Sequence, residues 1–100
     1  MDEYNVKVLS PARIDILDMV EHMNTLPPEL AQQRYDQFVE QIETLKDSPE
    51  RYPLAKDAQL RLRGYRTYQI GDYTLLFVIK GGTVEIRRVL FSKLHYERLL

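Results

Sequence analysis

Residues 61–90 decide the fold: they read RLRGYRTYQI (61–70), GD (71–72), YTLLFVIK (73–80), GG (81–82) and TVEIRRVL (83–90). The three longer runs are rich in β-branched and aromatic residues, which favour strands. The Gly-Asp and Gly-Gly pairs between them supply the positive φ that tight hairpins need. This stretch therefore predicts an antiparallel β-meander of three strands, followed by a short tail at residues 91–100.

The residues before the meander predict one strand and two helices. Residues 4–9, YNVKVL, alternate apolar and polar side chains, as a half-buried strand does. Ser10 and Pro11 then predict a helix start, with Ser10 as the N-cap and Pro11 at the first helical position. Two sets of apolar residues at helical spacing each predict a core-facing stripe: Ile16, Leu17, Met19, Val20 and Met23 in the first helix, and Ala31, Tyr35, Phe38, Ile42 and Leu45 in the second.

The prolines place the helix boundaries. The sequence NTLPP at 24–28 separates the two helices, and the second should run from about residue 28 to about residue 47, because Pro49 disfavours helix just before it. Two helices joined by a short loop form an antiparallel hairpin. Residues 50–59 are expected to be irregular. The predicted fold is α+β with two layers, in which the helix hairpin covers one face of the sheet and leaves the other face free to bind.

Composition excludes several classes of protein. The chain has no cysteine, so it has no disulfide framework, no thiolate nucleophile and no cysteine-based zinc site. No apolar stretch approaches the roughly 20 residues that span a bilayer, and the N-terminus lacks the pattern of a signal peptide. We therefore expect one soluble, cytoplasmic domain over residues 1–100, with no membrane partner. With two histidines and no Gly-rich phosphate loop, any enzyme here would be free of metal and of small-molecule cofactors.

Charge is divided between the two halves of the chain. Residues 1–50 hold 4 Lys/Arg and 11 Asp/Glu, whereas residues 51–100 hold 10 and 4, so formal charges of −7 and +6 give the total of −1. The division favours a basic face for a polyanion, backed by an acidic helical layer. The alternative is that solvent-facing helices simply carry more carboxylates than sheets do. Guanidinium groups and tyrosines on a stiff sheet would suit phosphates and bases.

The tail contains groups suited to RNA cleavage without a metal. Such cleavage needs a base, an acid and cations that hold the charge developing on the phosphorus oxygens. His95 titrates near neutrality, and Tyr96 can donate a proton or stack on a base. Lys93 and Arg98 flank this pair. The alternative is a tail that packs its apolar residues on the core and leaves His95 in solvent.

Adjacent residues of a strand face opposite sides, so Arg87 and Arg88 cannot both point to one binding face without a bulge. If Val84 and Ile86 face the core, Arg87 points outward. Arg88 then points inward or to the edge of the sheet.

Several motifs resemble the RelE/ParE family of bacterial toxins. They are LRGYR at 62–66, IGDY at 70–73, RVL at 88–90 and YERLL at 96–100, and the front half has the family's order of strand, helix and helix. The resemblance covers nearly the whole chain. It implies the toxin half of a type II toxin–antitoxin pair, with a cognate antitoxin as partner. An acidic antitoxin segment is expected to wrap the basic sheet face.

The ending Lys93-Leu94-His95-Tyr96 is similar to that of YoeB-like members, which cleave mRNA on the ribosome. The resemblance therefore favours a toxin that arrests growth as a ribosome-dependent, metal-independent mRNA endonuclease. The resemblance implies that His95 is the general base or acid and that Tyr96 orients or stacks the nucleotide. It also implies that Arg66 and Lys93 hold phosphate. The further RNA-binding residues that we predict are Arg61, Arg63, Tyr65, Tyr68, Arg87, Arg88 and Arg98.

Two departures from the family keep other mechanisms open. Thr74 stands where nuclease members usually carry arginine, and loss of such a charge-stabilising donor typically costs about 10²–10³ in rate. Phe91 and Leu94 replace a common histidine and arginine. One alternative is a ParE-like toxin that poisons DNA gyrase by binding. The others are a weakened toxin kept for antitoxin binding and repression, or a binding module without toxicity.

Overall fold

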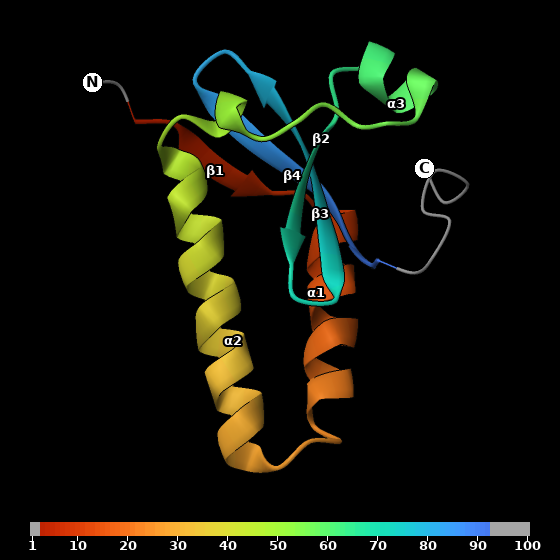
Figure 1. Cartoon of the computed structure of the whole chain (residues 1–100). Helices are drawn as coiled ribbons and strands as arrows, with labels where there is room; N and C mark the ends of the chain where they lie inside the picture. The colour runs from red at the N-terminus through yellow and green to blue at the C-terminus, as the bar shows by residue number, and fades with distance from the viewer. Residues whose placement is uncertain (1–2, 93–100) are drawn as a thin grey trace.

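The computed structural model describes residues 3–92 and has the α+β architecture that the sequence predicts (Figure 1). Its sheet has four strands in the order β1-β4-β3-β2. Two short 3₁₀ helices, η1 and η2, follow the second long helix, and a short third helix precedes the meander. The elements are β1 Asn5–Val8, α1 Ser10–Met23, α2 Pro28–Glu43, η1 Thr44–Lys46, η2 Pro49–Arg51, α3 Ala58–Leu62, β2 Arg66–Ile70, β3 Tyr73–Lys80 and β4 Thr83–Phe91.

The predicted meander is confirmed, because β2 pairs antiparallel with β3 and β3 pairs antiparallel with β4. The N-terminal strand β1 joins the sheet beside β4 and runs parallel to it, from Asn5 opposite Thr83 to Val8 opposite Ile86. The two hairpin turns begin with glycines at positive φ, 57° at Gly71 and 58° at Gly81. Among the described strands, the first and the last along the chain are therefore neighbours in the sheet.

The β3–β4 turn offers a matched pair of glycine substitutions. Gly81 has a φ of 58°, while Gly82 lies outside the left-handed region, and an added Cβ would meet no atom at either position. We expect Gly81→Ala to lower the free energy of unfolding by about 1 kcal/mol, because alanine is strained at positive φ. Gly82→Ala serves as the control and should cost less. Urea denaturation of both variants measures the difference, and equal costs would contradict the assignment of strain to Gly81.

Both predicted helices are present, but the expected N-cap is wrong. α1 begins at Ser10 itself, its N-cap is Leu9, and no side chain caps its first turn, although Pro11 does lie in that turn as predicted. The Leu9 N–H donates to the carbonyl of Ile86 at 3.0 Å. Hydrogen bonding to β4 therefore continues to Leu9, and the helix begins at the next residue. Ser10 then lies inside the first turn and not at the N-cap position.

The stripe predicted for α1 is only partly correct. Its buried residues are Ala12, Met19 and Met23, whereas Leu17 is 68% exposed. α1 lies against β4, so the row that contains Ala12 and Met19 faces the sheet and the row that contains Leu17 does not. On α2, Phe38 is buried as predicted, but Tyr35 is 41% exposed. Part of each predicted stripe is therefore left outside the core.

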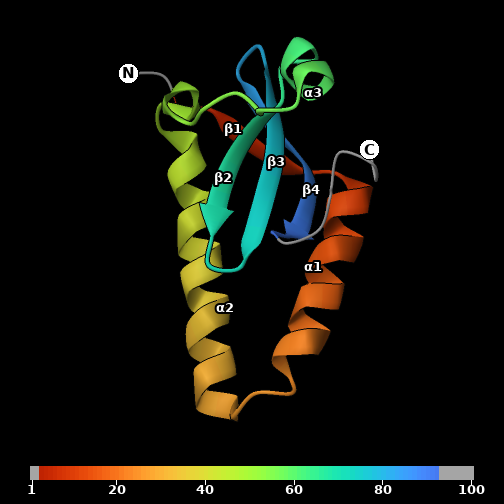
Figure 2. The ribbon, with the colours of Figure 1, turned by 45° about the vertical axis from the view of Figure 1, so that its right-hand side comes forward.

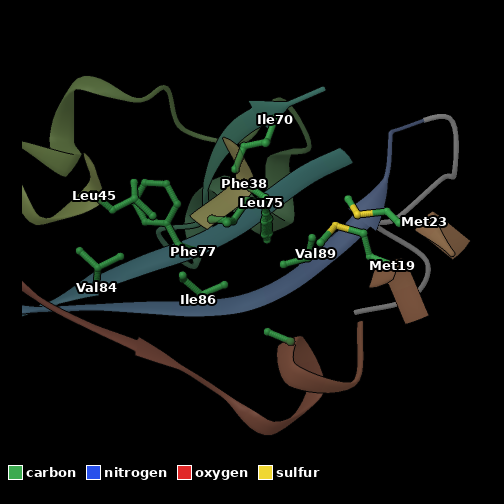
Figure 3. Close-up of a cluster of buried hydrophobic side chains, with 11 residues drawn as sticks. Met19, Met23, Phe38, Leu45, Ile70, Leu75, Phe77, Val84, Ile86 and Val89 are labelled. Carbon is green, nitrogen blue, oxygen red and sulfur yellow. The ribbon is translucent and has the colours of Figure 1, made fainter. Parts of the chain in front are cut away.

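The main core lies between the helices and one face of the sheet (Figure 3). Phe77 and Ile86 lie at its centre and are fully buried. The helical layer contributes methionines from α1 and Phe38 from α2. The full cluster is Ala12, Met19, Met23, Phe38, Leu45, Ile70, Leu75, Phe77, Val84, Ile86 and Val89.

The second face of the sheet is not free, which corrects the expectation that it is open for binding. A second buried cluster covers part of it, with Ala55, Leu60 and Tyr65 packed with Leu76, Val78 and Leu90. Residues 61–65 are therefore not a strand: α3 ends at Leu62, and Gly64 turns the chain with a φ of 81°. The physical reason lies in β3, which is buried at every position from Thr74 to Val78, as a strand covered on both faces must be.

Within residues 3–92, no helix is both long enough and apolar enough to cross a membrane.

Candidate functional site

The predicted site residues divide between described and undescribed parts of the chain. Lys93, His95, Tyr96 and Arg98 lie outside the described residues, so their roles stay predictions. The other seven are described: Arg61, Arg63, Tyr65, Arg66, Tyr68, Arg87 and Arg88. Their partners determine how much of their charge and ring surface is available to a ligand.

Arg66 ties a loop to the sheet. It is the first residue of β2, and its Nη1 donates to the carbonyl of Glu50 at 3.0 Å and to that of Tyr52 at 2.7 Å. In register it stands opposite Phe77, whose side chain lies in the core on the helix side of the sheet. Arg66 therefore holds residues 50–52 in place, and a phosphate would have to compete with two backbone carbonyls for its guanidinium.

Tyr68 lies in an aromatic cluster beside Arg66. Its ring stacks on Tyr52 with centroids 4.1 Å apart, and the guanidinium of Arg51 lies 4.9 Å from the centroid of Tyr52. Burial raises the pKa of Tyr68. Burial also acts to raise the pKa of Tyr52, but hydrogen bonds with Thr44, Tyr68 and Arg51 outweigh it and leave that pKa below its ordinary value. One face of the Tyr68 ring is thus occupied by Tyr52.

A β-bulge separates the two adjacent arginines of β4. Leu76 stands opposite Arg88 while Phe77 stands opposite Ile86, so Arg87 is the extra residue. The Arg87 guanidinium lies 5.9 Å from the centroid of Tyr65 and donates to Glu85 Oε1 from Nη2 at 2.8 Å.

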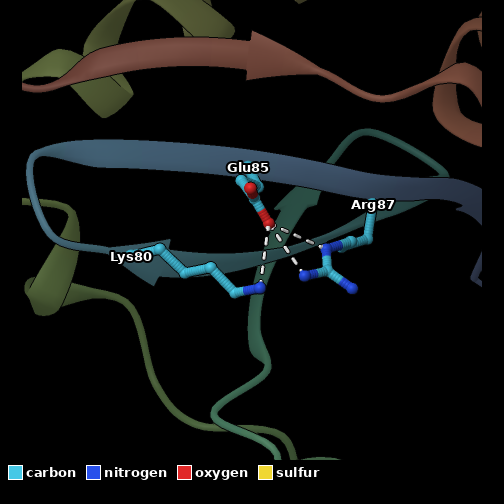
Figure 4. A network of polar contacts seen from close by, with 3 residues as sticks. All are labelled: Lys80, Glu85 and Arg87. Carbon is cyan, nitrogen blue, oxygen red and sulfur yellow. Dashed lines mark hydrogen bonds and ion pairs between the residues drawn. The ribbon is translucent and has the colours of Figure 1, made fainter.

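Glu85 also faces Lys80, whose Nζ lies 3.8 Å away (Figure 4). The hydrogen bond from Arg87 holds the pKa of Glu85 below its ordinary value. Glu85 thereby offsets part of the positive charge at this hairpin.

Arg88 points toward α1. Its Nε donates to Asp15 Oδ2 at 2.7 Å, and its Nη2 donates to Asp15 Oδ1 at 3.0 Å. The backbone N–H of Val89 donates to the same carboxylate at 2.9 Å. This hydrogen bonding raises the pKa of Arg88. The sequence left two orientations open for Arg88, inward or toward the edge of the sheet. β1 pairs with β4 only as far as Ile86, so Arg88 lies where this edge of β4 is uncovered, and its guanidinium connects the sheet to α1.

The described arginines of the predicted binding face come from three elements of the fold, α3, β2 and β4. Arg61 lies on α3 and donates from Nη1 to the carbonyl of Lys56 at 3.1 Å, and Arg63 is exposed at the end of that helix. Arg66 lies on β2 and Arg88 on β4, with β3 between them. Within residues 3–92, the side chains of Arg61, Arg66 and Arg88 each donate hydrogen bonds to groups of the chain itself, so a ligand would have to compete for them.

A groove of about 540 Å³ lies along β2, and Thr74, near the start of β3, is part of its lining. Thr74 is 5% exposed, and its hydroxyl donates to Gln69 Oε1 at 3.1 Å and lies 3.0 Å from Ser92 Oγ. Gln69 Nε2 donates to Ser92 Oγ at 2.5 Å and to the carbonyl of Gly71 at 3.0 Å. Thr74 is therefore held in a closed network of neutral groups.

Among the described residues that line this groove, only Lys56 carries a full charge at neutral pH. Hydroxyl and amide groups can bind polar groups of a partner, but they supply less charge stabilisation than a guanidinium does. The sequence pointed to Thr74 as a residue that matters for function, but it did not point to its hydrogen-bond partners Gln69 and Ser92. The register of a hairpin with the two-residue turn 71–72 would have placed Gln69 opposite Thr74, as it is found.

Within the described part of the chain, no group of three or more His, Cys, Asp or Glu residues could hold a metal ion.

Comparison with known proteins places this fold among toxins. Residues 6–93 match a family model described as the ParE toxin of the type II toxin–antitoxin system parDE. The search of curated proteins found no match. Among solved structures, a chain of the chromosomal ParDE toxin–antitoxin system from P. aeruginosa has a TM-score of 0.75 and 21% identity, covering 91% of this chain and 98% of that one.

Two further structures are similar to the chain. A chain of the RelBE2 toxin–antitoxin complex from Mycobacterium tuberculosis has a TM-score of 0.57 and 29% identity, covering 89% of this chain and 98% of that one. A chain of the archaeal RelE–RelB complex from Pyrococcus horikoshii OT3 has a TM-score of 0.52 and 17% identity, covering 91% and 97%. The likenesses at 21% and 17% identity are evidence for the fold alone.

Proposed function

The chain belongs to the ParE toxin family of type II toxin–antitoxin systems, and from that premise we propose that it arrests growth by binding DNA gyrase, without chemistry of its own. In this proposal residues 1–100 act as one toxin domain in the cytoplasm. A cognate antitoxin neutralises it, as the pairing of toxin with antitoxin in the similar structures suggests.

The observation that carries the proposal is the environment of Thr74. In the nuclease members that the sequence resembles, an arginine at this position stabilises charge in the transition state. Here the position is occupied by a buried hydroxyl that is already hydrogen-bonded to Gln69 and Ser92. An inhibitor that acts only by binding needs no charge at this position, whereas a ribonuclease without it would lose about 10²–10³ in rate.

The second candidate is the ribosome-dependent mRNA endonuclease, and the ending Lys93-Leu94-His95-Tyr96 favours it. In that mechanism His95 and Tyr96 would act on the nucleotide while Arg66 and Lys93 hold phosphate. Arg66 would have to exchange its hydrogen bonds to Glu50 and Tyr52 for the phosphate. The two candidates differ in whether His95 is required, so one variant separates them.

The test is induced expression of the chain and of His95→Ala in a bacterial host that lacks the antitoxin. We expect both to stop colony formation equally, to induce the DNA-damage response and to leave mRNA intact. The purified chain should inhibit supercoiling by gyrase and trap gyrase on DNA. Colony counts, a damage reporter, primer extension on mRNA and the supercoiling assay measure these outcomes.

Three results would contradict the proposal. Because general acid–base catalysis contributes about 10²–10⁴-fold, a nuclease should lose its toxicity with His95→Ala, and colony counts should rise about tenfold or more. New mRNA ends on the ribosome would support the same conclusion. Harmless expression of the unchanged chain would favour a weakened toxin kept for antitoxin binding.

A further inference from the structure

The short helix α3 presents a leucine to solvent. Leu62 is 86% exposed, whereas Leu60, two residues earlier and on the other side of the helix, is 2% exposed. Leu60 belongs to the buried cluster on the second face of the sheet, so α3 is attached through one side and turns its other side outward. Two views show α3 at the end of the molecule opposite the connection between α1 and α2 (Figure 1 and Figure 2).

Backbone hydrogen bonds fix the chain around Leu62. The N–H of Arg63 donates to the carbonyl of Leu60 at 3.1 Å, and the N–H of Tyr65 donates to the same carbonyl at 3.0 Å. The N–H of Ala55 donates to the carbonyl of Tyr65 at 2.8 Å, which ties the segment before α3 to the segment after it. The exposure of Leu62 is therefore set by the fold, and a side chain held in this way loses little freedom on binding.

Three cations lie beside this leucine. Lys56, Arg61 and Arg63 are all exposed, and among the described residues none of the three forms an ion pair. Arg61 donates from Nη1 to the carbonyl of Lys56 at 3.1 Å, which orients its guanidinium and leaves its other N–H groups for a ligand. Asp57 accepts from the N–H of Leu60 at 3.0 Å and so caps α3. The name α3 tip is used below for Lys56, Arg61, Leu62 and Arg63.

The α3 tip lies on the basic side of a molecule whose charge is divided between its two faces. Residues 51–66 carry five Lys/Arg and one Asp, a formal charge of +4, whereas α1 and α2 together carry two arginines and seven carboxylates, a formal charge of −5. The buried cluster that contains Leu60 lies on the face of the sheet opposite the helices. A polyanion is therefore attracted to the α3 side and repelled by the helix side.

The chemistry of the α3 tip favours duplex DNA over other anionic partners. Proteins that bind the minor groove hold phosphates with arginine or lysine and insert apolar wedges, leucine among them, between the base steps. Leucine is under-represented among the residues that dominate protein–protein binding, which argues against an acidic protein. Duplex RNA has a wide and shallow minor groove, which a single leucine fills poorly.

We propose that the α3 tip binds the minor groove of duplex DNA, with Lys56, Arg61 and Arg63 on the phosphates and Leu62 against the bases. That this DNA is the segment held by gyrase rests on the proposed function. The toxin would then contact both the enzyme and its DNA, which suits an inhibitor that traps one on the other. Binding to DNA as such rests only on the α3 tip.

Fluorescence anisotropy of a labelled DNA duplex of about 20 base pairs with the purified full chain measures the binding. We expect binding at about 50 mM salt that weakens as salt is added, because each cation on a phosphate contributes about one to the slope of log affinity against log salt. The paired substitution Arg61→Gln and Arg63→Gln should lower this slope by about two, and the affinity at low salt by about tenfold.

The matched control is the paired substitution Arg13→Gln and Arg34→Gln, which removes the same charge from exposed arginines of α1 and α2. It should change the affinity by less than about twofold. Leu62→Ala should weaken binding about fivefold without changing the salt slope, because it removes an apolar contact and no charge. Leu17→Ala, at a leucine that is 68% exposed on α1, should leave the affinity unchanged.

Three results would overturn the proposal: no binding to DNA at low salt, equal effects of the two arginine pairs, or an RNA duplex of the same sequence bound as tightly as the DNA. Equal effects of Leu62→Ala and Leu17→Ala would overturn the placement of Leu62 in the groove.

Trapping of gyrase on DNA is measured separately with the same variants. The pair Arg61→Gln and Arg63→Gln should need about tenfold more protein than the pair Arg13→Gln and Arg34→Gln to trap the enzyme. An unchanged chain that binds DNA through the α3 tip but does not inhibit gyrase would contradict the proposed function and not the DNA site. A chain that inhibits gyrase without binding DNA would overturn only the DNA site.

Discussion

Phe77→Ala is expected to lower the free energy of unfolding by about 3–5 kcal/mol, the cost of removing a buried aromatic side chain from a packed core. Phe77 is fully buried at the centre of the main core and makes an edge-to-face contact with Tyr52, with ring centroids 6.1 Å apart. The free energy of unfolding of a domain of this size is about 5–15 kcal/mol, so the loss is a large share of its stability. Urea denaturation followed by circular dichroism measures the change.

Phe91 is the matched control for this substitution. It is the last residue of β4 and is 39% exposed, so Phe91→Ala should cost about 1 kcal/mol. If Phe77→Ala does not fold, Phe77→Leu, which retains much of the side-chain volume, should still fold with a smaller loss. A cost for Phe77→Ala no larger than that for Phe91→Ala would show that Phe77 is not at the centre of the core.

Asp15→Asn is expected to cost about 2–4 kcal/mol, somewhat less than breaking a fully buried ion pair because the site is partly open to solvent. The carboxylate side chain is 9% exposed and that of Arg88 is 22% exposed. The substitution removes the charge that accepts two hydrogen bonds from Arg88 and one from Val89. α1 would then lose its main polar connection to β4.

Asp18→Asn, on the exposed side of the same helix, is the control and should change stability by less than about 0.5 kcal/mol. A double-mutant cycle with Arg88→Met isolates the energy of the pair. Because the hydrogen bond to Asp15 raises the pKa of Arg88, the contribution of the charged guanidinium is present at neutral pH and is lost when strongly alkaline solution deprotonates it. Equal costs for Asp15→Asn and Asp18→Asn would contradict this role.

Local patterns predicted most of the fold. The meander was readable because glycine pairs and β-branched runs act within a few residues, and the turns at Gly71 and Gly81 have the positive φ that those pairs predict. The two long helices were predicted for the same reason, because apolar spacing and proline positions also act within a few residues. The burial of Leu17 was predicted wrongly, since periodicity shows that a helix has an apolar face but does not show how much of that face another element covers.

The sequence did not predict that α3 and the residues around it pack on the second face of the sheet, although one feature of β3 indicated it. β3 is apolar at consecutive positions and does not alternate, which is typical of a strand buried on both faces. The covering residues, including Leu60 and Tyr65, precede the meander in a segment that was expected to be irregular or a strand. Because five residues make only a short helix, α3 had no periodic pattern strong enough to predict it.

The element order, the two tight turns and the family motifs follow directly from the amino-acid sequence, because each depends on residues close together along the chain. Which charged side chains have partners within the protein depends instead on how distant segments pack together. Arg88 is paired with Asp15, 73 positions away, and Arg66 is held by carbonyls 14 and 16 positions away. Side-chain partners at such separations depend on how the layers pack, so the number of arginines in the sequence does not show that Arg66 and Arg88 are hydrogen-bonded within the folded chain.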